Sequence, residues 1–122
     1  MIIYENKTIK IEKEQSSIPW LKVFAKEPCK ELSNCSKKTR TMLYYYIETI
    51  EEVMINYYNP DKINIASFGN YVPQVHIHIQ ARFKNDEWFP EPTWGKSQRK
   101  SNLNLPKFEI FIQKLLEKLD DQ

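Results

Sequence analysis

Apolar and polar residues alternate in five short segments of the chain, and this alternation predicts five β-strands. The first two strands, at residues 2–5 and 8–13, flank an Asn-Lys pair and form a hairpin. A third strand covers residues 20–25, and the last two cover about residues 62–67 and 72–83. A Gly-Asn pair between the last two strands is typical of a hairpin turn. The pattern therefore predicts an antiparallel five-stranded meander sheet.

Between the third and fourth strands, apolar residues recur at steps of three and four, which is the period of an α-helix. This helix is expected over about residues 37–57, after capping serines and before an Asn59-Pro60 stop. A C-terminal helix is expected to begin at Pro106. The predicted fold class is α+β, a meander sheet with one long crossing helix and a C-terminal helix.

Both helices carry an apolar stripe that we assign to the core rather than to a binding site. The stripe of the long helix consists of Met42, Tyr46, Ile50, Val53, Met54 and Tyr57. The stripe of the C-terminal helix consists of Phe108, Phe111, Ile112, Leu115, Leu116 and Leu119. Because Tyr44, Tyr45 and Tyr46 are consecutive and point in different directions, at most two of them can be buried.

Length and charge limit the classes of function. The 122 residues suit one domain, and the formal charge is only +2, from 18 basic and 16 acidic residues. This balance excludes the dense basic field of a general nucleic-acid-binding protein. The N-terminal Met-Ile-Ile-Tyr-Glu-Asn-Lys meets charge too early for a signal peptide, and no membrane span is expected. We therefore expect a cytoplasmic protein without nucleic-acid or membrane partners.

The only cysteines, Cys29 and Cys35, allow more than one interpretation. A disulfide would close a small loop, but free thiols are the simpler expectation in a reducing cytoplasm. Zinc usually takes four ligands, or three and water, and the cysteine spacing does not match the usual metal knuckle. We therefore expect no metal site.

Residues 73–82, Pro-Gln-Val-His-Ile-His-Ile-Gln-Ala-Arg, contain both histidines of the chain. Alternate side chains of a strand share a face, so this strand has an apolar face and a polar face. The polar face carries Gln74, His76, His78, Gln80 and Arg82. The simplest alternative to a functional site is that the two histidines are only the polar side of a half-exposed strand.

A neutral imidazole can attack phosphorus to form a phosphohistidine-type intermediate, while a second imidazole and an amide hold the phosphate oxygens. The turn upstream favours such a site, because the hairpin brings Asn64, Asn70 and Gln74 to the same region as the two histidines. Only two glycines are present, which excludes a glycine-rich phosphate loop.

The strand resembles the motif of the histidine triad family of nucleotide hydrolases and transferases, His-φ-His-φ-His-φ-φ, in which φ is apolar. His76 and His78 match the second and third histidines, whereas Gln74 occupies the first position and Gln80 the last apolar position. The segment is most similar to a bacterial branch with glutamine first, and the likeness covers about residues 2–98.

The resemblance also extends to polar residues before the motif. Gly69-Asn70 stands where family members commonly have Gly-Gln, and Asn64 stands where many have an asparagine that faces the nucleotide. It implies that His76 is the nucleophile, held by a backbone carbonyl, and that His78 contacts the scissile phosphate. Asn64, Asn70 and Gln74 would bind phosphate or nucleotide. An amide does not titrate, so Gln74 cannot deliver a proton.

The activity implied is hydrolysis or nucleotidyl transfer at the α-phosphorus of a dinucleoside polyphosphate or nucleoside phosphoramidate, through a nucleotidyl-histidine. No cofactor is implied except Mg²⁺ accompanying a polyphosphate, and the typical state is a homodimer. Residues 1–98 would form the nucleotide-binding domain, and residues 99–122 a linker and helix that pack on this domain or on a partner subunit. Gln74 and Gln80 raise the alternative of a nucleotide-binding regulatory protein with little or no turnover.

An aromatic and proline-rich loop follows the histidine strand. It contains Trp88, Phe89 and Trp94. Prolines restrict its freedom, so an ordered loop is expected. It can cover the nucleotide pocket, cross to a partner subunit, or pack locally.

Overall fold

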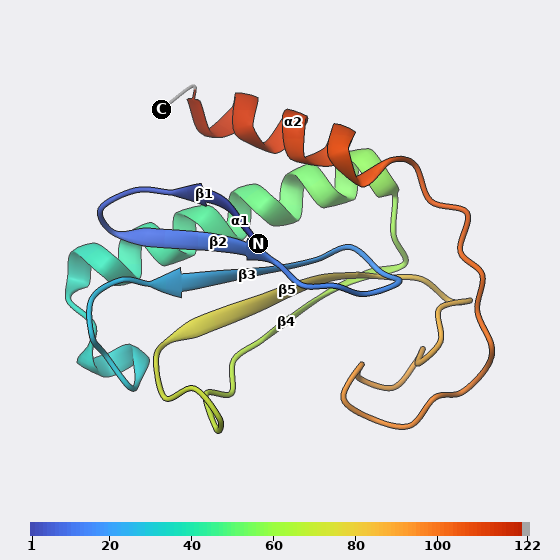
Figure 1. The fold of residues 1–122 in the computed structure, drawn as a ribbon, viewed down its shortest axis with the longest axis horizontal. Helices are drawn as coiled ribbons and strands as arrows, with labels where there is room; N and C mark the ends of the chain where they lie inside the picture. Colours follow the sequence, from blue (N-terminus) through green and yellow to red (C-terminus); the bar gives the residue numbers. More distant parts are fainter. Residues whose placement is uncertain (121–122) are drawn as a thin grey trace.

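The computed structural model describes residues 1–120 and consists of one antiparallel sheet with two α-helices (Figure 1). The strands are β1 (Ile2–Glu5), β2 (Ile9–Lys13), β3 (Trp20–Ala25), β4 (Lys62–Ala66) and β5 (His76–Arg82). The helices are α1 (Lys37–Tyr58) and α2 (Phe108–Asp120), and a short 3-10 turn, η1 (Leu32–Asn34), precedes α1. The predicted elements are therefore present, with an α+β fold.

The strand order is β1-β2-β3-β5-β4, which differs from a sequential meander because β5 inserts between β3 and β4. Every residue of β5 is buried, whereas Lys62 and Ile65 of β4 are exposed. A strand buried on both faces needs hydrogen-bonding neighbours on both sides, and the more polar β4 can remain at the edge. The register places His76 opposite Phe24 and His78 opposite Lys22.

The histidine strand begins at His76, four residues later than the predicted start. The preceding residues are held in a loop, because Gln74 N–H donates to the Val72 carbonyl at 2.8 Å and Val75 N–H donates to the Cys29 carbonyl at 2.9 Å. Backbone groups that are bonded within the loop and to Cys29 cannot extend the β4–β5 ladder. The alternation of polar and apolar residues in the sequence therefore starts before β5 itself does.

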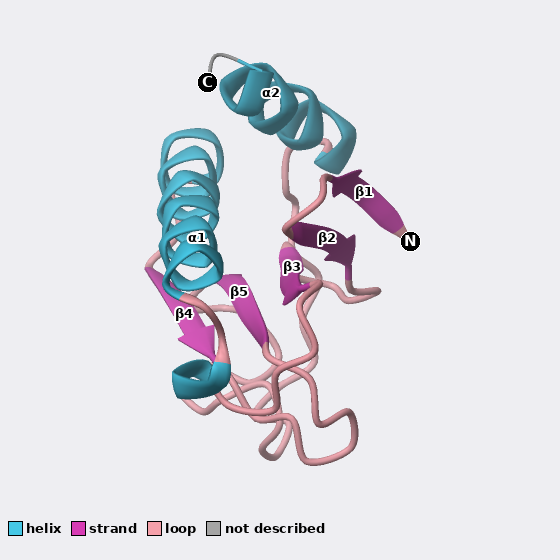
Figure 2. Cartoon of the chain, turned by 90° about the vertical axis from the view of Figure 1, so that its left-hand side faces the viewer, coloured by secondary structure: helices cyan, strands magenta, loops and turns pink. Residues whose placement is uncertain are grey.

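Helix α1 begins after Ser36, whose hydroxyl accepts from Thr39 N–H, and ends at Asn59 in the left-handed region with φ of 49°. It packs on β5 and β3 (Figure 2). Of the three consecutive tyrosines only Tyr46 is buried, within the predicted limit. The buried stripe includes Leu43 and Tyr58, whereas Met42 and Tyr57 at its border are only partly buried.

Helix α2 packs against α1 of the same chain (Figure 1, Figure 2). The ring of Phe111 lies 5.5 Å from Tyr58 and 6.4 Å from Tyr57, and the Tyr57 hydroxyl donates to the Lys107 carbonyl. Phe111, Leu115 and Leu119 are buried, so α2 closes one end of the core. Within residues 1–120, no helix has the length and apolarity needed to cross a membrane.

A buried ion pair fixes the chain where it leaves β5. The Arg82 guanidinium donates to both carboxylate oxygens of Asp86, at 2.8 and 3.1 Å, and also to Asn64 Oδ1 and the Glu91 carbonyl. Three backbone N–H groups also donate to this carboxylate, those of Phe83, Trp88 and Phe89. Burial alone raises the pKa of Asp86, but the hydrogen bonds from Arg82 and the backbone outweigh it, and the pKa is lowered.

We predict that Asp86→Asn lowers the free energy of unfolding by about 3–5 kcal/mol, because the change leaves the buried Arg82 charge uncompensated. Urea unfolding followed by circular dichroism measures this loss. Glu12→Gln is the matched control, since Glu12 pairs with Lys10 at 2.8 Å near the surface, and such pairs contribute less than about 1 kcal/mol. Equal losses in the two variants would show that the buried pair has no special role.

Candidate active site

The histidine-bearing face of β5 lines a pocket of about 530 Å³. Strands β3 and β5 form its floor, and the loops before and after β5 form its walls. Its lining includes Glu14, Lys22, Phe68, Asn70, His76, His78 and Trp94. The pocket is lined mainly by apolar groups with a few polar groups, and its size is typical of a site for a small molecule.

His76 is held by the backbone of its own strand. Its Nδ1 lies 2.7 Å from the carbonyl oxygen of Gln74, and its ring stacks on Phe24 with centroids 4.8 Å apart. A carbonyl oxygen only accepts hydrogen bonds, so this contact assigns the proton of the neutral ring to Nδ1. The Nε2 atom of His76 therefore has a free lone pair.

His78 has the opposite tautomer. The indole N–H of Trp20 donates to His78 Nδ1 at 3.0 Å, and an indole cannot accept. Nδ1 is therefore the unprotonated nitrogen, and Nε2 carries the hydrogen. The pKa of His78 is lowered from its ordinary 6.5 to about 4, chiefly by burial and then by His76 and Lys22, and only Glu14 opposes this shift. His78 is neutral at physiological pH.

Both His76 and His78 line the pocket. The Nε2 atoms of the two histidines have no hydrogen-bond partner in the described structure. Every fully buried side-chain nitrogen or oxygen of the described residues does have a partner, so these two Nε2 atoms are not fully buried. Both atoms must therefore be accessible. The ring centroids are 5.2 Å apart, so a single phosphoryl group can meet a nucleophilic nitrogen and a hydrogen-bond donor together.

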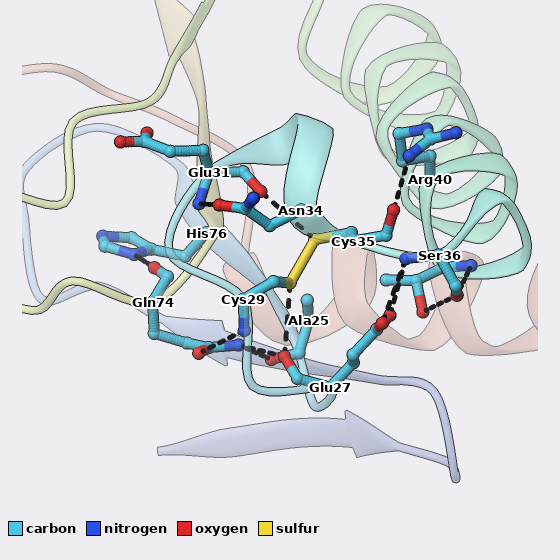
Figure 3. The surroundings of a disulfide bond; sticks show 11 residues. Ala25, Glu27, Cys29, Glu31, Asn34, Cys35, Ser36, Arg40, Gln74 and His76 are labelled. Atoms are coloured by element: carbon cyan, nitrogen blue, oxygen red, sulfur yellow. Dashed lines mark hydrogen bonds between the residues drawn. A yellow bond between two sulfur atoms is a disulfide. The ribbon is translucent and has the colours of Figure 1, made fainter.

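The amide of Gln74 bonds to backbone groups beside the disulfide (Figure 3). Its nitrogen donates to the carbonyls of Ala25 and Glu27 at 2.7 and 2.6 Å, and its oxygen accepts from Cys29 N–H at 3.2 Å. Gln74 lines a separate hollow, and its amide does not point at the pocket that holds the histidines. Its contribution in this structure is the backbone carbonyl that holds His76.

The other residues predicted for the site are divided between two places. Asn70 lines the pocket, next to Gly69 at φ of 78°. Asn64 Oδ1 accepts from Arg82 at 2.7 Å, so this oxygen is already bound inside the fold. Gln80 donates to the Thr93 hydroxyl at 2.8 Å. The structure thus gathers His76, His78 and Asn70, and places Asn64 and Gln74 elsewhere.

Several residues around the two histidines were missed by reasoning from the sequence; Lys22, Phe68 and Trp94 line the pocket, and Trp20 contacts His78 from β3. Trp20 and Lys22 are at alternate positions of β3, so the pairing of β3 with β5 would have found them. The ring of Trp94 lies 5.0 Å from His78 and 5.3 Å from Trp20, so part of the aromatic loop does reach the pocket. Phe68 contacts both Trp94 and His78.

Cys29 and Cys35 form a disulfide, so the prediction of free thiols is wrong. The η1 turn brings their Cα atoms to 5.4 Å, which is within the range for such a bond. Glu27, Cys29 and Cys35 have potential ligand atoms within 4.8 Å of one another, but disulfide formation removes both thiolates from that set. Cys29 N–H donates to the Gln74 side chain (Figure 3), and the Cys29 carbonyl accepts from Val75 N–H, so the disulfide loop supports the segment that leads into the histidine strand.

The fold and the site together are an antiparallel sheet that presents two histidines at alternate positions of an interior strand. The chain matches the HIT domain, the histidine triad domain, over residues 1–85 and belongs to this family. No curated protein matches it.

Several solved structures share the fold, among them three histidine triad proteins. A histidine triad protein from Bradyrhizobium japonicum is 28% identical with a TM-score of 0.80, over 97% of this chain and 89% of that one. A histidine triad protein from Marinobacter aquaeolei VT8 is similar in fold, with 24% identity and a TM-score of 0.80 over 98% of this chain and 90% of that one. A histidine triad protein from Sinorhizobium meliloti 1021 is also similar in fold, with 24% identity and a TM-score of 0.77 over 96% of this chain and 87% of that one. These structures confirm the predicted fold; the narrower branch with glutamine in the first position stays a prediction.

We predict that acid weakens the fold through His78. The unfolded chain binds a proton at this residue with an ordinary pKa of 6.5, whereas the folded pKa is about 4. The contribution to stability is therefore present above pH 6.5 and is lost as the pH falls toward 4. Urea unfolding across this range should show a smaller loss in His78→Gln, which does not titrate. Parallel curves for the two proteins would contradict the assignment.

We predict that reducing the Cys29–Cys35 bond lowers the free energy of unfolding. The cysteines are 6 residues apart, and the chain-entropy relation gives about 2 kcal/mol for a loop of this length. Urea unfolding with and without dithiothreitol measures the loss. The double variant Cys29→Ser with Cys35→Ser is the control, and it should resemble the reduced protein and not respond to dithiothreitol. No effect of dithiothreitol on the unmodified protein would overturn the prediction.

Proposed function

We propose that the protein is a nucleotide hydrolase or nucleotidyl transferase that acts at the α-phosphorus of a dinucleoside polyphosphate or nucleoside phosphoramidate. The single observation that carries this proposal is the pair of opposite tautomers in one pocket. His76 presents an unprotonated Nε2, and His78 presents an Nε2–H. Attack on a phosphoryl group needs a nucleophile and a donor to its oxygens, and these two atoms supply them.

In the first step His76 Nε2 attacks the α-phosphorus. A nitrogen–phosphorus bond forms, the bond from phosphorus to the leaving group breaks, and its electron pair departs with the leaving group. The ring becomes cationic, and its Nδ1–H remains bonded to the Gln74 carbonyl. His78 Nε2–H donates to a non-bridging oxygen while charge develops on it.

In the second step water attacks the same phosphorus. The nitrogen–phosphorus bond breaks, its electron pair returns to His76 Nε2, and the water proton leaves to solvent or phosphate. A nucleoside monophosphate is released, and the tautomer of His76 is restored. An alcohol or a second phosphate in place of water makes the same reaction a nucleotidyl transfer.

Other pocket residues suit a nucleotide. The Lys22 ammonium pairs with Glu14 at 2.9 Å at the pocket and provides positive charge for a polyphosphate. Phe68 and Trp94 offer exposed apolar rings for the nucleoside. Asn70 offers an amide to phosphate or ribose. No protein-bound cofactor enters these steps, and Mg²⁺ would arrive with the polyphosphate.

The wider setting that we propose is a homodimer that acts on diadenosine polyphosphates or related adducts. Family membership supports this proposal. A nucleotide-binding regulatory protein without turnover is the alternative, and it is supported by the absence of a titrating group at Gln74. Formation of the covalent intermediate separates the two functions.

We predict that His76→Ala abolishes release of adenosine monophosphate from diadenosine polyphosphates and adenosine phosphoramidate. Loss of the nucleophile should lower kcat/KM by about 10³-fold or more. Phosphorus NMR follows the product, and mass spectrometry of the quenched protein detects a nucleotidyl adduct that His76→Ala lacks. His78→Gln is the matched control. It retains the nucleophile and should still form the adduct, but more slowly.

Retained turnover in His76→Ala would remove this residue from the mechanism. Nucleotide binding without adduct or product in the unmodified protein would favour the regulatory alternative.

A further inference from the structure

Trp20 has no part in the steps above, yet it makes the only side-chain hydrogen bond to His78 in the described structure. It begins β3, opposite Gln80, and its side chain is half-buried. Its Nε1 lies 3.0 Å from His78 Nδ1, and the two rings meet edge to face at 66°. This contact is directional and is distinct from packing alone.

The indole N–H opposes protonation of His78. A protonated imidazole has N–H groups on both nitrogens, so its Nδ1–H would point at the Trp20 N–H inside a half-buried site. The titratable groups around His78 are His76 on β5, Lys22 on β3, and Glu14. Only Glu14 favours protonation, and its carboxylate is already paired with Lys22. The loop residues Phe68 and Trp94 contribute only aromatic contacts to this ring.

We propose that Trp20 is a positioning residue that fixes His78 as a neutral Nε2–H donor, and that the site therefore favours leaving groups that depart without a proton. The first part rests on the hydrogen bond. The second part rests on the proposed function as well.

The link to the leaving group follows from proton balance. Neutral His78 can share its Nε2–H with an oxygen but cannot release it without becoming an imidazolate. Gln74 carries no titrating proton, and its amide is bonded to Ala25 and Glu27. A phosphate leaves an anhydride as a stable anion and needs no acid, whereas the amine of a phosphoramidate must gain a proton. We therefore infer a preference for dinucleoside polyphosphates over phosphoramidates.

The tautomer is tested without any substrate. The chain has only two histidines, so two-bond proton–nitrogen NMR resolves both rings, and His76→Gln assigns them. Unmodified His78 should show a protonated Nε2 and an unprotonated Nδ1. Trp20→Phe should abolish the preference of His78 for the Nε2–H tautomer and raise the pKa of His78. Placing benzothienylalanine at position 20, with sulfur in place of the indole N–H, should do the same while preserving the shape of the ring.

The matched control is Trp94→Phe, which changes the other indole beside His78 without removing a hydrogen bond to it. The tautomer should stay at Nε2–H in this variant. A protonated Nδ1 in the unmodified protein would overturn the inference even if every variant failed to fold. An unchanged tautomer in the benzothienylalanine protein would overturn it as well.

The second test compares kcat/KM for diadenosine tetraphosphate and adenosine phosphoramidate across pH. The unmodified protein should prefer the anhydride. In Trp20→Phe, protonated His78 becomes an acid, so the ratio should move toward the phosphoramidate by about 10-fold or more at mildly acid pH. An equal loss on both substrates would reduce Trp20 to a structural role. If the unmodified protein turns over neither substrate, the proposed function fails while the NMR result still decides the role of Trp20.

Discussion

The structure depends on one constraint, which is that β5 is buried on both faces while every second residue of it is polar. All seven residues from His76 to Arg82 are buried. A buried polar group without a partner costs about 1–3 kcal/mol, so each of these side chains has to find one. Gln80 bonds to Thr93 and Arg82 to Asp86, and these contacts fasten the loop after the strand. In each histidine the Nδ1 atom has a hydrogen-bond partner within the fold, and the Nε2 atom remains available to a ligand in the pocket.

Patterns within a segment were enough to predict most of the fold. Alternation located the strands, and the three- and four-residue period located α1 to within one residue of its end at Tyr58. Properties that depend on contacts between segments were not predictable in this way. Strand order decides that Trp20 meets His78, and the geometry of η1 decides that Cys29 meets Cys35. The pattern showed Arg82 on the histidine face but not that Asp86 neutralises it.

The glutamine in the first position of the motif has a physical explanation in its hydrogen bonds. The Gln74 amide donates twice, to Ala25 and Glu27, and accepts once, from Cys29. A neutral imidazole has one donor and one acceptor, so histidine could not satisfy all three backbone groups. The side chain thereby ties the disulfide loop to the residue whose carbonyl holds His76 (Figure 3). A residue that the sequence suggested for phosphate contact instead holds the ring of His76 through its backbone carbonyl.

The difference between the two histidines comes from their partners and not from the residues themselves. Both lie on one strand and both reach the same pocket, yet His76 faces an acceptor and His78 faces a donor. Exchanging the partners would exchange the tautomers, so that His76 would lose its free lone pair at Nε2 and His78 would lose its donor. The carbonyl belongs to Gln74, in the segment that leads into β5, and the indole belongs to Trp20 on β3. The pairing of β3 with β5 therefore determines the tautomer of His78 as well as the order of the strands. A catalytic role assigned from the motif alone is therefore incomplete without the strand that lies beside it.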